Sequence, residues 1–432
     1  MKLADLAGKN VCILGYGREG QAMLGAIERA GIDCAMTVAD QNPQTELQTT
    51  NYKLQTGPDY LRNLDHFDVI IRSPGIFPCK ELKAVQDRIT NSTQIFLEEA
   101  IAKGATVIGV TGSKGKSTTA SLIYAILRTG EKDVSLVGNI GEPAISHVKE
   151  ANPNKFFVQE MSSYQLMDLT SSPRIAVVTA FFPEHLNYHG SLEAYRDAKT
   201  NITRFQKEGD IVFFNAQSEG ARAIAKEGKG EKCGFTLEDA PIGLTETKLI
   251  GAHNLGNIAA AFLVGKHLGI PDDVSKNTIR EFKSLPHRLQ PCGEHHGIEW
   301  VDDAISTTPE STIAALDALG KNVATLILGG QDRGNDFSEL ADRIARSSIG
   351  TVILTGESGQ RIRVVLERAT ALVNIYEAAS MKEAVSLART HTQVPSPKSQ
   401  VPICLLSPAS PSYGMFKNFE ERGTAFLEAI LS

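Results

Sequence analysis

The strongest constraint on the fold lies between residues 106 and 128, where the sequence TVIGVTGSKGKSTTASLIYAILR joins three signals in succession. Thr106–Val110 is a short apolar, β-branched run, which is typical of a buried parallel strand. Thr111–Gly115 interrupts the run, and a helix is expected to begin at Lys116 and to stop at Gly130. At such a turn the backbone N–H groups converge on a phosphate, and the helix dipole adds about half a positive charge. The stretch therefore predicts a phosphate-binding loop.

Side chains of the same stretch predict how a nucleotide is held. Lys116 is expected to reach the β- and γ-phosphates, and the hydroxyl of Ser117 or Thr118 is expected to ligate Mg²⁺. The long form of this loop has glycine where Val110 stands, so the loop is a shortened Gly112-x-x-Gly115-Lys116-Ser117. An ordinary strand–helix turn is the alternative, because glycine is common there. The predicted nucleotide contacts are Gly112, Ser113, Lys114, Gly115, Lys116, Ser117 and Thr118.

Length and charge limit the classes of protein to consider. A chain of 432 residues predicts about three domains. The net charge of −6 argues against a general nucleic-acid surface and against a binder of anionic membranes, so local loops and metal ions must hold any polyanionic ligand. No apolar run approaches the roughly 18 residues of a membrane span, and the first residues do not read as a signal peptide. The scattered cysteines lack metal-ligand spacing and favour reduced thiols in a cytosolic protein: Cys12, Cys34, Cys79, Cys233, Cys292 and Cys404.

A second glycine loop follows the first expected strand. Lys9–Leu14 predicts that strand, Gly15–Gly20 reads GYGREG, and Asp40 follows a second strand, as in a dinucleotide-binding βαβ unit. A nicotinamide-dependent dehydrogenase is one interpretation, but the phosphate-binding domain begins too early to leave room for a nicotinamide domain. The loop fits better as the site of another nucleotide's diphosphate, with Asp40 facing a uracil or ribose or capping a strand end. Ser73 and Gly75, in a turn beside this loop, are expected either to donate to the same diphosphate or to form a plain turn.

Two residues at expected strand ends face the phosphate-binding loop. Glu160 follows the strand Phe156–Gln159, and His185 follows the strand Ala176–Ala180, at the edge where open α/β sheets place their sites. Glu160 is a candidate ligand for Mg²⁺, which prefers oxygen, although a strand-end glutamate is often only solvated. His185 is a less usual ligand for Mg²⁺ and also fits a core histidine.

The rest of the middle third contains two helices of interest. Ser191 is expected to cap a helix that contains Lys199, which composition alone assigns to the surface. Glu227–Lys248 is expected to form hairpins. Asn254 and Asn257 lie one helical turn apart at the start of an alanine-rich helix, where carboxamides either contact a purine edge or cap the helix.

The last third again alternates strands with helices. Arg288 follows a linker, and its planar side chain suits a clamp on a γ-phosphate. Polar loops at 302–308, 329–333 and 407–413 suggest a moving lid that brings a third ligand to the phosphate site. A flexible joint is expected at Thr392–Gln400. The expected strands are Ile298–Val301, Val323–Leu328, Thr351–Leu354 and Pro402–Leu406.

Taken together, these residues resemble the Mur ligases, the ATP-dependent amide-bond-forming enzymes of peptidoglycan synthesis. The short first domain and the ending resemble most the members that add glutamate to UDP-N-acetylmuramoyl-L-alanine. The matching motifs follow one another through nearly the whole chain: TGSKGKST (111–118), GNIG (138–141), EMSSYQL (160–166), EHL (184–186), YRDAK (195–199), HNLGN (253–257), LPHR (285–288), LGGQDR (328–333) and SPASPSYGMFKNFEERG (407–423).

The resemblance implies a three-domain α/β fold. A Rossmann-like N-terminal domain (1–96) would bind the UDP-sugar, a central P-loop mononucleotide-binding α/β domain (97–285) ATP, and a C-terminal Rossmann-like α/β domain (286–432) the amino acid. It also implies a cytoplasmic, monomeric enzyme with ATP and Mg²⁺ as cofactors, and no nucleic-acid or membrane partner. The reaction would pass through an acyl phosphate and release ADP and phosphate.

The resemblance further implies roles for single residues. The catalytic residues would be Lys116, Glu160, His185, Lys199 and Arg288. The metal ligands would be Ser117, Glu160, His185 and Lys199, the last as a carbamate. Beyond the loop, Asn254 and Asn257 would contact adenine, and Arg288 and Asp303 phosphate and ribose. The sugar nucleotide and its peptide would contact Gly17, Arg18, Glu19, Asp40, Ser73, Gly75, Asn139 and Ser162. The incoming glutamate would contact Thr307, Arg333, Ser412, Tyr413 and Phe419.

The match departs from the family where the amino acid binds. The members that add D-glutamate usually have a lysine in an NDSKAT run, and Ile305 takes that place in the run Asp302–Thr307. Arg333 stands where a lysine is common. A different set of cations would therefore meet the amino-acid carboxylate, and the resemblance leaves both D- and L-glutamate open.

Three rival functions follow from the same residues. A folylpolyglutamate synthase shares the ligase core, but it lacks a first domain of this kind. A nicotinamide-dependent oxidoreductase would rest on Gly15–Gly20 alone. A non-catalytic nucleotide sensor would bind ATP without forming ADP.

Overall fold

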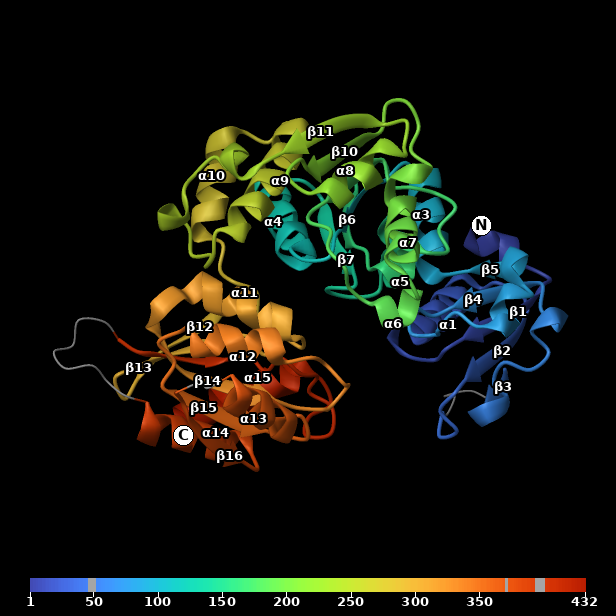
Figure 1. Cartoon of the computed structure of the whole chain (residues 1–432). Coiled ribbons are helices and arrows are strands. Elements are labelled where there is room, and N and C mark those ends of the chain that lie inside the picture. Colours follow the sequence, from blue (N-terminus) through green and yellow to red (C-terminus); the bar gives the residue numbers. More distant parts are fainter. Residues whose placement is uncertain (46–51, 370–371, 393–400) are drawn as a thin grey trace. The chain divides into compact units, whose positions relative to one another are not determined.

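The computed structural model describes residues 1–45, 52–369, 372–392 and 401–432, and it shows an α/β protein built on three sheets (Figure 1). These residues form two compact units. The first comprises Met1–Thr247 with His253–Phe282 and holds two sheets, and the second comprises Lys248–Ala252 with Lys283–Ser432 and holds the third. None of the described helices is both long and apolar enough to cross a membrane.

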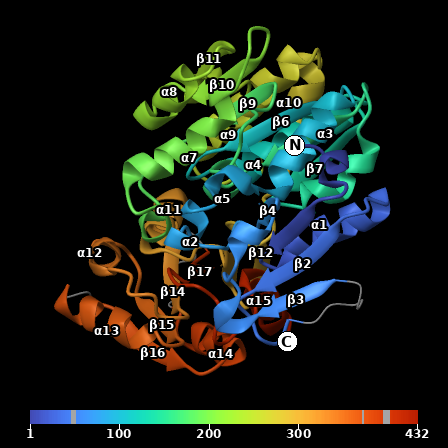
Figure 2. The ribbon, with the colours of Figure 1, turned by 90° about the vertical axis from the view of Figure 1, so that its right-hand side faces the viewer.

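The first sheet is parallel throughout, with strand order β3-β2-β1-β4-β5. Figure 2 shows β2 and β3 of this sheet, drawn in blue. The chain reverses its direction of winding between β1 and β4, so the loops after these two strands meet at a topological switch point. The strands are β1 (Asn10–Leu14), β2 (Ala35–Asp40), β3 (Lys53–Thr56), β4 (Val69–Arg72) and β5 (Ile89–Thr90), with helices α1 (Arg18–Ala30), α2 (Lys80–Lys83) and α3 (Ser92–Ala102).

The second sheet is also parallel, with strand order β11-β10-β9-β6-β8-β7. Because β8, β6 and β9 are neighbours, the loops that follow them share one edge of the sheet. The strands are β6 (Thr106–Thr111), β7 (Val134–Gly138), β8 (Phe156–Glu160), β9 (Ile175–Val178), β10 (Ile211–Asn215) and β11 (Glu231–Phe235). The helices are α4 (Lys116–Thr129), α5 (Ser163–Leu166), α6 (Leu186–His189), α7 (Leu192–Arg204), α8 (Glu219–Lys226), α9 (His253–His267) and α10 (Asp272–Glu281).

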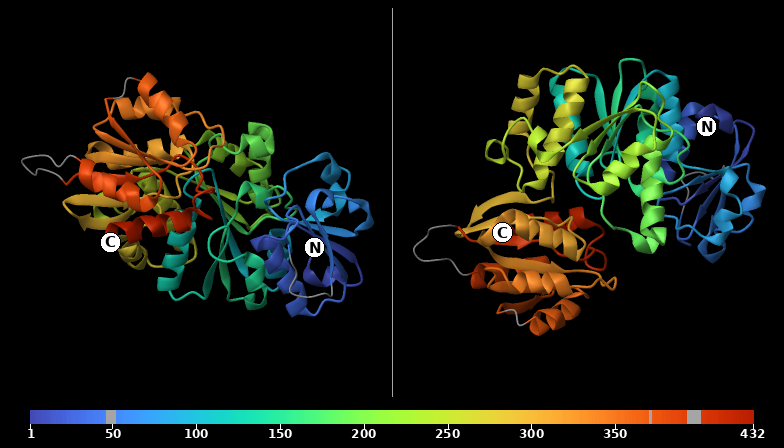
Figure 3. Two further views of the ribbon diagram at one scale, coloured as in Figure 1. Left: turned by 90° about the horizontal axis from the view of Figure 1, so that it is seen from below. Right: turned by 45° about the horizontal axis from the view of Figure 1, so that its top comes forward.

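The third sheet has strand order β12-β13-β17-β14-β15-β16, and β12 alone runs antiparallel to its neighbour. Helices cover both faces of this sheet, as the orange and red part of the ribbon shows (Figure 3). Alternate residues of its strands face two cores, one with α11–α13 and one with α14 and α15. The strands are β12 (Gln290–His295), β13 (Ile298–Asp302), β14 (Val323–Gly329), β15 (Thr351–Thr355), β16 (Asn374–Ala378) and β17 (Ile403–Leu406). The helices are α11 (Pro309–Leu319), α12 (Ser338–Ala345), α13 (Gly359–Arg368), α14 (Met381–His391) and α15 (Phe419–Leu431).

One hydrophobic core joins the first two sheets. It includes Val11 of β1, Ile27 of α1, Phe96 of α3 and Phe157 of β8, and all four side chains are fully buried. The rings of Phe96 and Phe157 meet edge to face with centroids 5.1 Å apart. Burial of such a side chain stabilises the fold by about 1.5–3 kcal/mol. This shared core explains why the first two sheets belong to a single compact unit.

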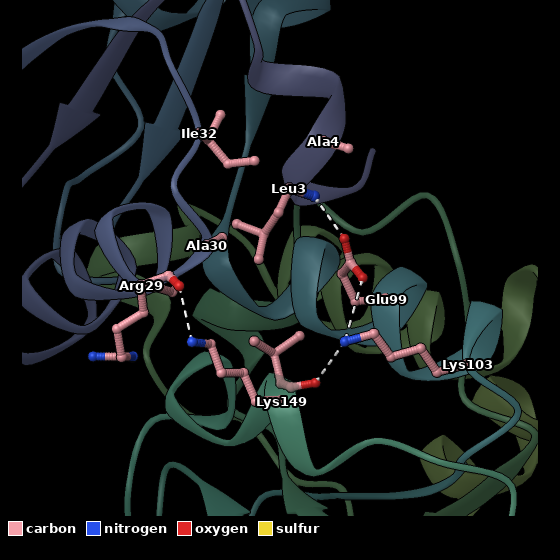
Figure 4. Close-up of a pocket in the computed structure, with 10 residues that line it drawn as sticks. Leu3, Ala4, Arg29, Ala30, Ile32, Glu99, Lys103 and Lys149 are labelled. Carbon is pink, nitrogen blue, oxygen red and sulfur yellow. Dashed lines mark hydrogen bonds and ion pairs between the residues drawn. The ribbon is translucent and has the colours of Figure 1, made fainter.

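A pocket of about 240 Å³ opens beside this core (Figure 4). Leu3 and Ile32 contribute apolar surface, and the Lys149 and Lys103 ammonium groups donate to the carbonyl oxygens of Arg29 (2.8 Å) and Val148 (3.0 Å). None of the residues predicted to bind a ligand lines this pocket.

Several expectations about the elements are corrected by the structure. Glu227–Lys248 does not form hairpins: β11 pairs in parallel with β10, and two short 3₁₀ helices follow it. β12 and β16 were not expected. The expected domain boundary after residue 96 falls inside α3, and the division into three domains stays a prediction. The expected joint Thr392–Gln400 lies, apart from Thr392, outside the described residues.

Candidate active site

The loop between β6 and α4 depends on two glycines. Gly112 has φ +150°, and a Cβ there would lie 1.9 Å from Thr179 Oγ1. Gly115, the N-cap of α4, has φ +87° and belongs to the left-handed region that favours glycine. A Cβ at Gly115 would lie 2.3 Å from Asn257 Oδ1. No larger residue fits either position, which explains the short Gly-x-x-Gly-Lys pattern.

The segment after β9 fixes the loop in place. Thr179 Oγ1 donates to the carbonyl oxygen of Lys114 (2.6 Å), and the N–H of Ser113 donates to the carbonyl oxygen of Ala180 (2.6 Å). The Lys114 ammonium pairs with Glu184 (2.8 Å). Lys116 turns back on the loop, where its ammonium donates to the carbonyl oxygens of Gly112 (3.1 Å) and Ser113 (2.8 Å). These contacts hold the loop in place, with its lysine at the start of α4.

Lys199 lies beneath the same loop. Its side chain is 1% exposed, and its nitrogen donates to the carbonyl oxygen of Gly112 (2.7 Å) and to Thr111 Oγ1 (3.3 Å). The nitrogen also lies 4.9 Å from the centre of the Tyr195 ring. Burial, together with the charge of Lys116, holds the pKa of Lys199 well below its usual range. The surface position that composition suggested is therefore wrong, and the neutral amine is favoured.

Glu160 ends β8 beside the loop and is 1% exposed. One carboxylate oxygen accepts from Asn139 Nδ2 (2.8 Å), while Oε2 is buried and has no hydrogen-bond partner among the described residues. A buried carboxylate oxygen without a partner is costly unless a cation meets it. This arrangement fits a metal ligand better than a solvated strand end.

His185 follows β9 with φ +55°, a conformation that is uncommon outside glycine. Its ring lies 5.2 Å from the ring of Tyr164, and desolvation lowers the pKa of the imidazole. His189 stacks on Tyr164 at 5.6 Å, and burial lowers its pKa to about 4. Both histidines are therefore neutral near pH 7, the form in which imidazole accepts a proton or binds a metal.

The two asparagines predicted at the start of α9 lie beside the loop. Asn257 Oδ1 accepts from Thr119 Oγ1 (3.2 Å), and Asn257 Nδ2 donates to Asn254 Oδ1 (2.8 Å). Both side chains are buried, as is Thr118, whereas Ser117 is half-buried. Both asparagines therefore lie beside the loop, as predicted.

The first glycine loop and the turn after β4 also meet as expected. Ser73 Oγ donates to the carbonyl oxygen of Gly15 (2.7 Å). The Asp40 carboxylate accepts from the N–H groups of Tyr16 (2.5 Å) and Asn42 (2.8 Å), so it caps the loop and the end of β2. Glu19 accepts from Ser92 Oγ (2.6 Å) and from Gln165 Nε2 (3.0 Å). The remaining residues predicted at this end of the unit are Gly17, Arg18, Gly75 and Asn139, which are exposed, and Ser162, which caps α5.

In the second unit, Asp303 lies directly after β13 and is 3% exposed. Its carboxylate accepts from the N–H of Leu289 (3.2 Å) and from Ser407 Oγ (2.8 Å). Burial raises the pKa of Asp303 to about 6. The charge of Arg288, which precedes β12 in the sequence, tends to lower that pKa.

Three loops of the second unit follow the parallel strands β13, β14 and β17. The buried guanidinium of Arg422 joins them, because it donates to the carbonyl oxygens of Ala304 (2.8 Å) and Ser410 (3.0 Å) and lies 3.5 Å from that of Gly329. The residues predicted for the amino acid lie on these loops and at the start of α15: Thr307 is half-buried, Ser412 is buried, Arg333 and Tyr413 are exposed with the guanidinium 5.4 Å from the ring centre, and Phe419 begins α15.

The structure thus gathers the predicted residues into two groups in the first unit, around the phosphate-binding loop and around the first glycine loop, and into one group in the second unit. In the first unit the phosphate-binding loop lies with Glu160, Lys199 and Asn257, and in the second unit Asp303 lies on the loop after β13. Sequence reasoning did not assign Thr179 or Arg422, which contact the phosphate-binding loop and the three loops of the second unit. Within the described ranges, no three His, Cys, Asp or Glu side chains gather as a metal site on their own.

Comparison with protein families supports the same division. The model of the Mur ligase middle domain matches residues 110–242, and the model of the Mur ligase glutamate ligase domain matches residues 287–395. The first match begins in β6 and includes the phosphate-binding loop, and the second includes β12–β16.

The chain is similar over its whole length to enzymes with curated names. It is 35% identical to UDP-N-acetylmuramoyl-L-alanine--L-glutamate ligase of Salinispora tropica, covering 100% of this chain and 99% of the relative. It is 32% identical to UDP-N-acetylmuramoylalanine--D-glutamate ligase of Acetivibrio thermocellus, covering 99% and 97%. It is 33% identical to the enzyme of that second name from Streptococcus agalactiae, covering 100% and 98%.

Solved structures with low sequence identity share the fold. UDP-N-acetylmuramate-alanine ligase MurC of Thermotoga maritima matches with a TM-score of 0.59 at 20% identity, over 97% of this chain and 98% of that chain. MurF ligase of Thermotoga maritima in complex with ADP matches with a TM-score of 0.59 at 15% identity, over 99% and 96%.

Proposed function

The chain belongs to the Mur ligase family of ATP-dependent amide-bond-forming enzymes, and we propose that it adds glutamate to UDP-N-acetylmuramoyl-L-alanine in the synthesis of peptidoglycan precursors. The observation that carries the proposal is the phosphate-binding loop with the buried Lys199 beneath it and the buried Glu160 beside it. A protein that only senses a nucleotide needs the phosphate-binding loop alone. A ligase also needs groups that stabilise the charge that develops during phosphate transfer.

The proposed reaction consists of two successive substitutions, the first at phosphorus and the second at carbon. A carboxylate oxygen of the sugar peptide attacks the γ-phosphorus of ATP, the bond to the β-phosphate oxygen breaks, and ADP leaves. The glutamate ammonium loses one proton, and its nitrogen then attacks the carbonyl carbon of the acyl phosphate. The nitrogen gives up a second proton to solvent as the tetrahedral intermediate forms. Phosphate leaves with the electron pair of the broken C–O bond, and the amide remains.

The chain's own residues act mainly on charge and position. Attack of a carboxylate on a triphosphate brings like charges together, at a cost of about 1 kcal/mol per pair at 4 Å in water and more when desolvated. The N–H groups of the loop, the N-terminus of α4 and the ammonium of Lys116 offset this repulsion. Arg288 of the second unit is proposed to contact the γ-phosphate and Asp303 the ribose, while Asn254 and Asn257 contact the adenine.

Mg²⁺ fits the donors around the loop. The unpartnered buried Oε2 of Glu160 and the hydroxyls of Ser117 and Thr118 are hard oxygen donors of the kind that Mg²⁺ prefers. When bound, Mg²⁺ supplies positive charge that stabilises the phosphates during transfer. We propose Glu160, Ser117, His185 and Lys199 as the residues that hold the metal ions.

Lys199 suits this role as a carbamate. Its lowered pKa favours the neutral amine, whose nitrogen adds to the carbon of CO₂ and loses a proton. The product is an anionic oxygen donor in place of a buried cation. Carbamylation would therefore convert Lys199 from a donor to Gly112 into a ligand for a metal ion.

The other two substrates are assigned to the remaining predicted groups. UDP is proposed to bind at Gly17, Arg18, Glu19, Ser73 and Gly75, with Asp40 acting by holding the loop. The muramoyl peptide is proposed to contact Asn139 and Ser162. Thr307, Arg333, Ser412, Tyr413 and Phe419 are proposed to line the glutamate site. In this proposal three domains, 1–96, 97–285 and 286–432, each bind one substrate, and the enzyme acts as a cytoplasmic monomer.

The enantiomer of glutamate is decided by experiment, because the curated relatives include enzymes named for either one. Purified protein is incubated with UDP-N-acetylmuramoyl-L-alanine, ATP, Mg²⁺ and either D- or L-glutamate, and phosphate release is recorded. Release that requires one enantiomer supports the proposal and identifies the substrate. ATP binding without any ADP, or release with a folate instead of the sugar nucleotide, contradicts it.

A further inference from the structure

One tyrosine, Tyr188 in α6, contacts both the turn after β4 and the segment that begins at His185. Its hydroxyl lies 3.0 Å from the carbonyl oxygen of Pro74 and 2.8 Å from that of Ile76, and the residue is 7% exposed. Its backbone N–H donates to the carbonyl oxygen of His185 (3.0 Å). The hydroxyl of Tyr188 thus contacts the turn that is proposed to bind UDP, and its backbone contacts His185, which is proposed to hold a metal ion.

Arg72, the last residue of β4, completes the junction. Its Nη1 donates to the carbonyl oxygen of Ile76 (3.0 Å) and to the Tyr188 hydroxyl (3.3 Å). Its other face pairs with Asp168 (2.6 Å), and both side chains of this pair are buried. Because Arg72 donates to the phenol oxygen, the single hydroxyl proton remains available for one carbonyl of the turn. The hydrogen bonds thus fix the position of the hydroxyl relative to the turn.

The ring of Tyr188 is held independently of its hydroxyl. Its centroid lies 4.2 Å from that of Tyr164, 4.7 Å from that of Phe77 and 5.1 Å from that of His189. Replacement of the tyrosine by phenylalanine therefore leaves the packing surface in place and removes only the polar connection. This separation makes the role of the hydroxyl testable.

We propose that Tyr188 is a positioning residue that couples sugar-nucleotide binding at residues 73–76 to ATP binding at the phosphate-binding loop. The inference rests on the proposed function. The turn also holds the first glycine loop through Ser73 Oγ and Gly15, so a bound diphosphate constrains both. From the turn, the path runs through the Tyr188 hydroxyl to the backbone of His185, which follows the strand next to the loop. Coupling through such contacts is reciprocal, because each ligand must alter the affinity for the other by the same factor.

The test measures this factor by calorimetry. The affinity of the full-length enzyme for Mg²⁺ and the β,γ-methylene analogue of ATP is determined with and without saturating UDP-N-acetylmuramoyl-L-alanine. In the wild type the sugar nucleotide is expected to tighten binding of the analogue about tenfold. In Tyr188→Phe the ratio is expected to fall to within about twofold of one, while the affinity for the analogue alone changes less than about threefold.

Tyr52→Phe is the matched control. It removes a tyrosine hydroxyl from the same unit, where Tyr52 donates to Glu28 on the surface, and it should keep the wild-type ratio. Should Tyr188→Phe fail to fold, Arg72→Lys replaces it, because lysine retains a cation opposite Asp168 but loses the planar group that contacts Tyr188 and Ile76. In Arg72→Lys the ratio of affinities is likewise expected to fall to near one.

Two results overturn the coupling while leaving the proposed function intact: a ratio of one in the wild type, or an unchanged ratio in Tyr188→Phe. If Tyr188 has a merely structural role, Tyr188→Phe would lower the melting temperature and weaken the binding of both ligands. The ratio of the affinities for the ATP analogue with and without the sugar nucleotide would then stay unchanged, which also contradicts the inference. Absence of any binding of the sugar nucleotide to the wild type overturns the proposed function and the coupling with it.

Discussion

Asp303 is expected to destabilise the second unit at neutral pH. Burial raises the pKa of this carboxyl from 3.8 to about 6, and the residue is 3% exposed. At about 1.4 kcal/mol per pH unit, the difference amounts to ~3 kcal/mol. The folded chain binds the proton more tightly than the unfolded chain does, so the contribution of Asp303 to stability is lost as the pH rises from about 4 to about 6.

Asp303→Asn should remove this cost, because the local hydrogen bonds accept an amide. The asparagine oxygen can accept from the N–H of Leu289, and its NH₂ can donate to Ser407 Oγ, which then donates to Thr312 Oγ1 at 3.0 Å. We expect the variant and the wild type to be equally stable near pH 4. At pH 7.5 the variant should be more stable by up to ~3 kcal/mol. Its activity should fall, since the residue is proposed to contact ribose.

The assay uses the chain's single tryptophan, Trp300, which is buried in β13 of the same unit. Urea unfolding followed by its fluorescence from pH 4 to pH 8 reports the stability of the second unit. Asp302→Asn is the control, because it removes the charge that pairs with the half-buried His287 (2.7 Å) and should destabilise the unit by ~1–3 kcal/mol. If Asp303→Asn and the wild type show the same slope of unfolding free energy against pH, burial does not hold the proton on Asp303.

Three further predictions concern the phosphate-binding loop. Lys116→Ala should lower kcat for phosphate release by about two to three decades, because it removes a donor to the transition state; a change of less than about tenfold would contradict that role. Glu160→Gln should raise the Mg²⁺ concentration for half-maximal activity at least about tenfold, and an unchanged Mg²⁺ requirement would show that Glu160 is not a ligand. Gly115→Ala should lower the melting temperature more than Gly209→Ala, which has a similar φ of +91° but no atom within 4 Å of the new Cβ, because only the former meets Asn257; equal losses would show that backbone strain alone matters.

The elements around the phosphate-binding loop were predictable because their signals are local. An apolar run, two glycines and a lysine within twelve residues suffice to predict β6, the turn and the start of α4. The sequence could not show why each glycine is required, since the atoms that exclude a Cβ come from Thr179 and Asn257. These residues are far away along the chain.

The errors in the strands have two different causes. β12 carried a local signal that went unused: it ends at His295, β13 begins at Ile298, and His296 and Gly297 form a two-residue turn with φ +57° and +74°. β11 carried none, because it is an edge strand with mainly exposed residues whose partner, β10, lies beyond an intervening helix. Hairpins were expected there because parallel pairing is not visible in a short window of sequence.

The burial of Lys199 shows how periodicity predicts what composition does not. Tyr195, Ala198, Lys199 and Ile202 follow the i, i+3, i+4, i+7 pattern of one helical face, and all four are buried in α7. A lysine on an apolar stripe must lose its charge, find an anion or donate to buried carbonyls, because an unpaired ammonium is costly to bury. Lys199 donates to Gly112 and Thr111 on the loop itself. The pattern therefore indicates that Lys199 is buried, and the structure places its nitrogen at the base of the phosphate-binding loop, where the proposed carbamate would replace a cation by an anion.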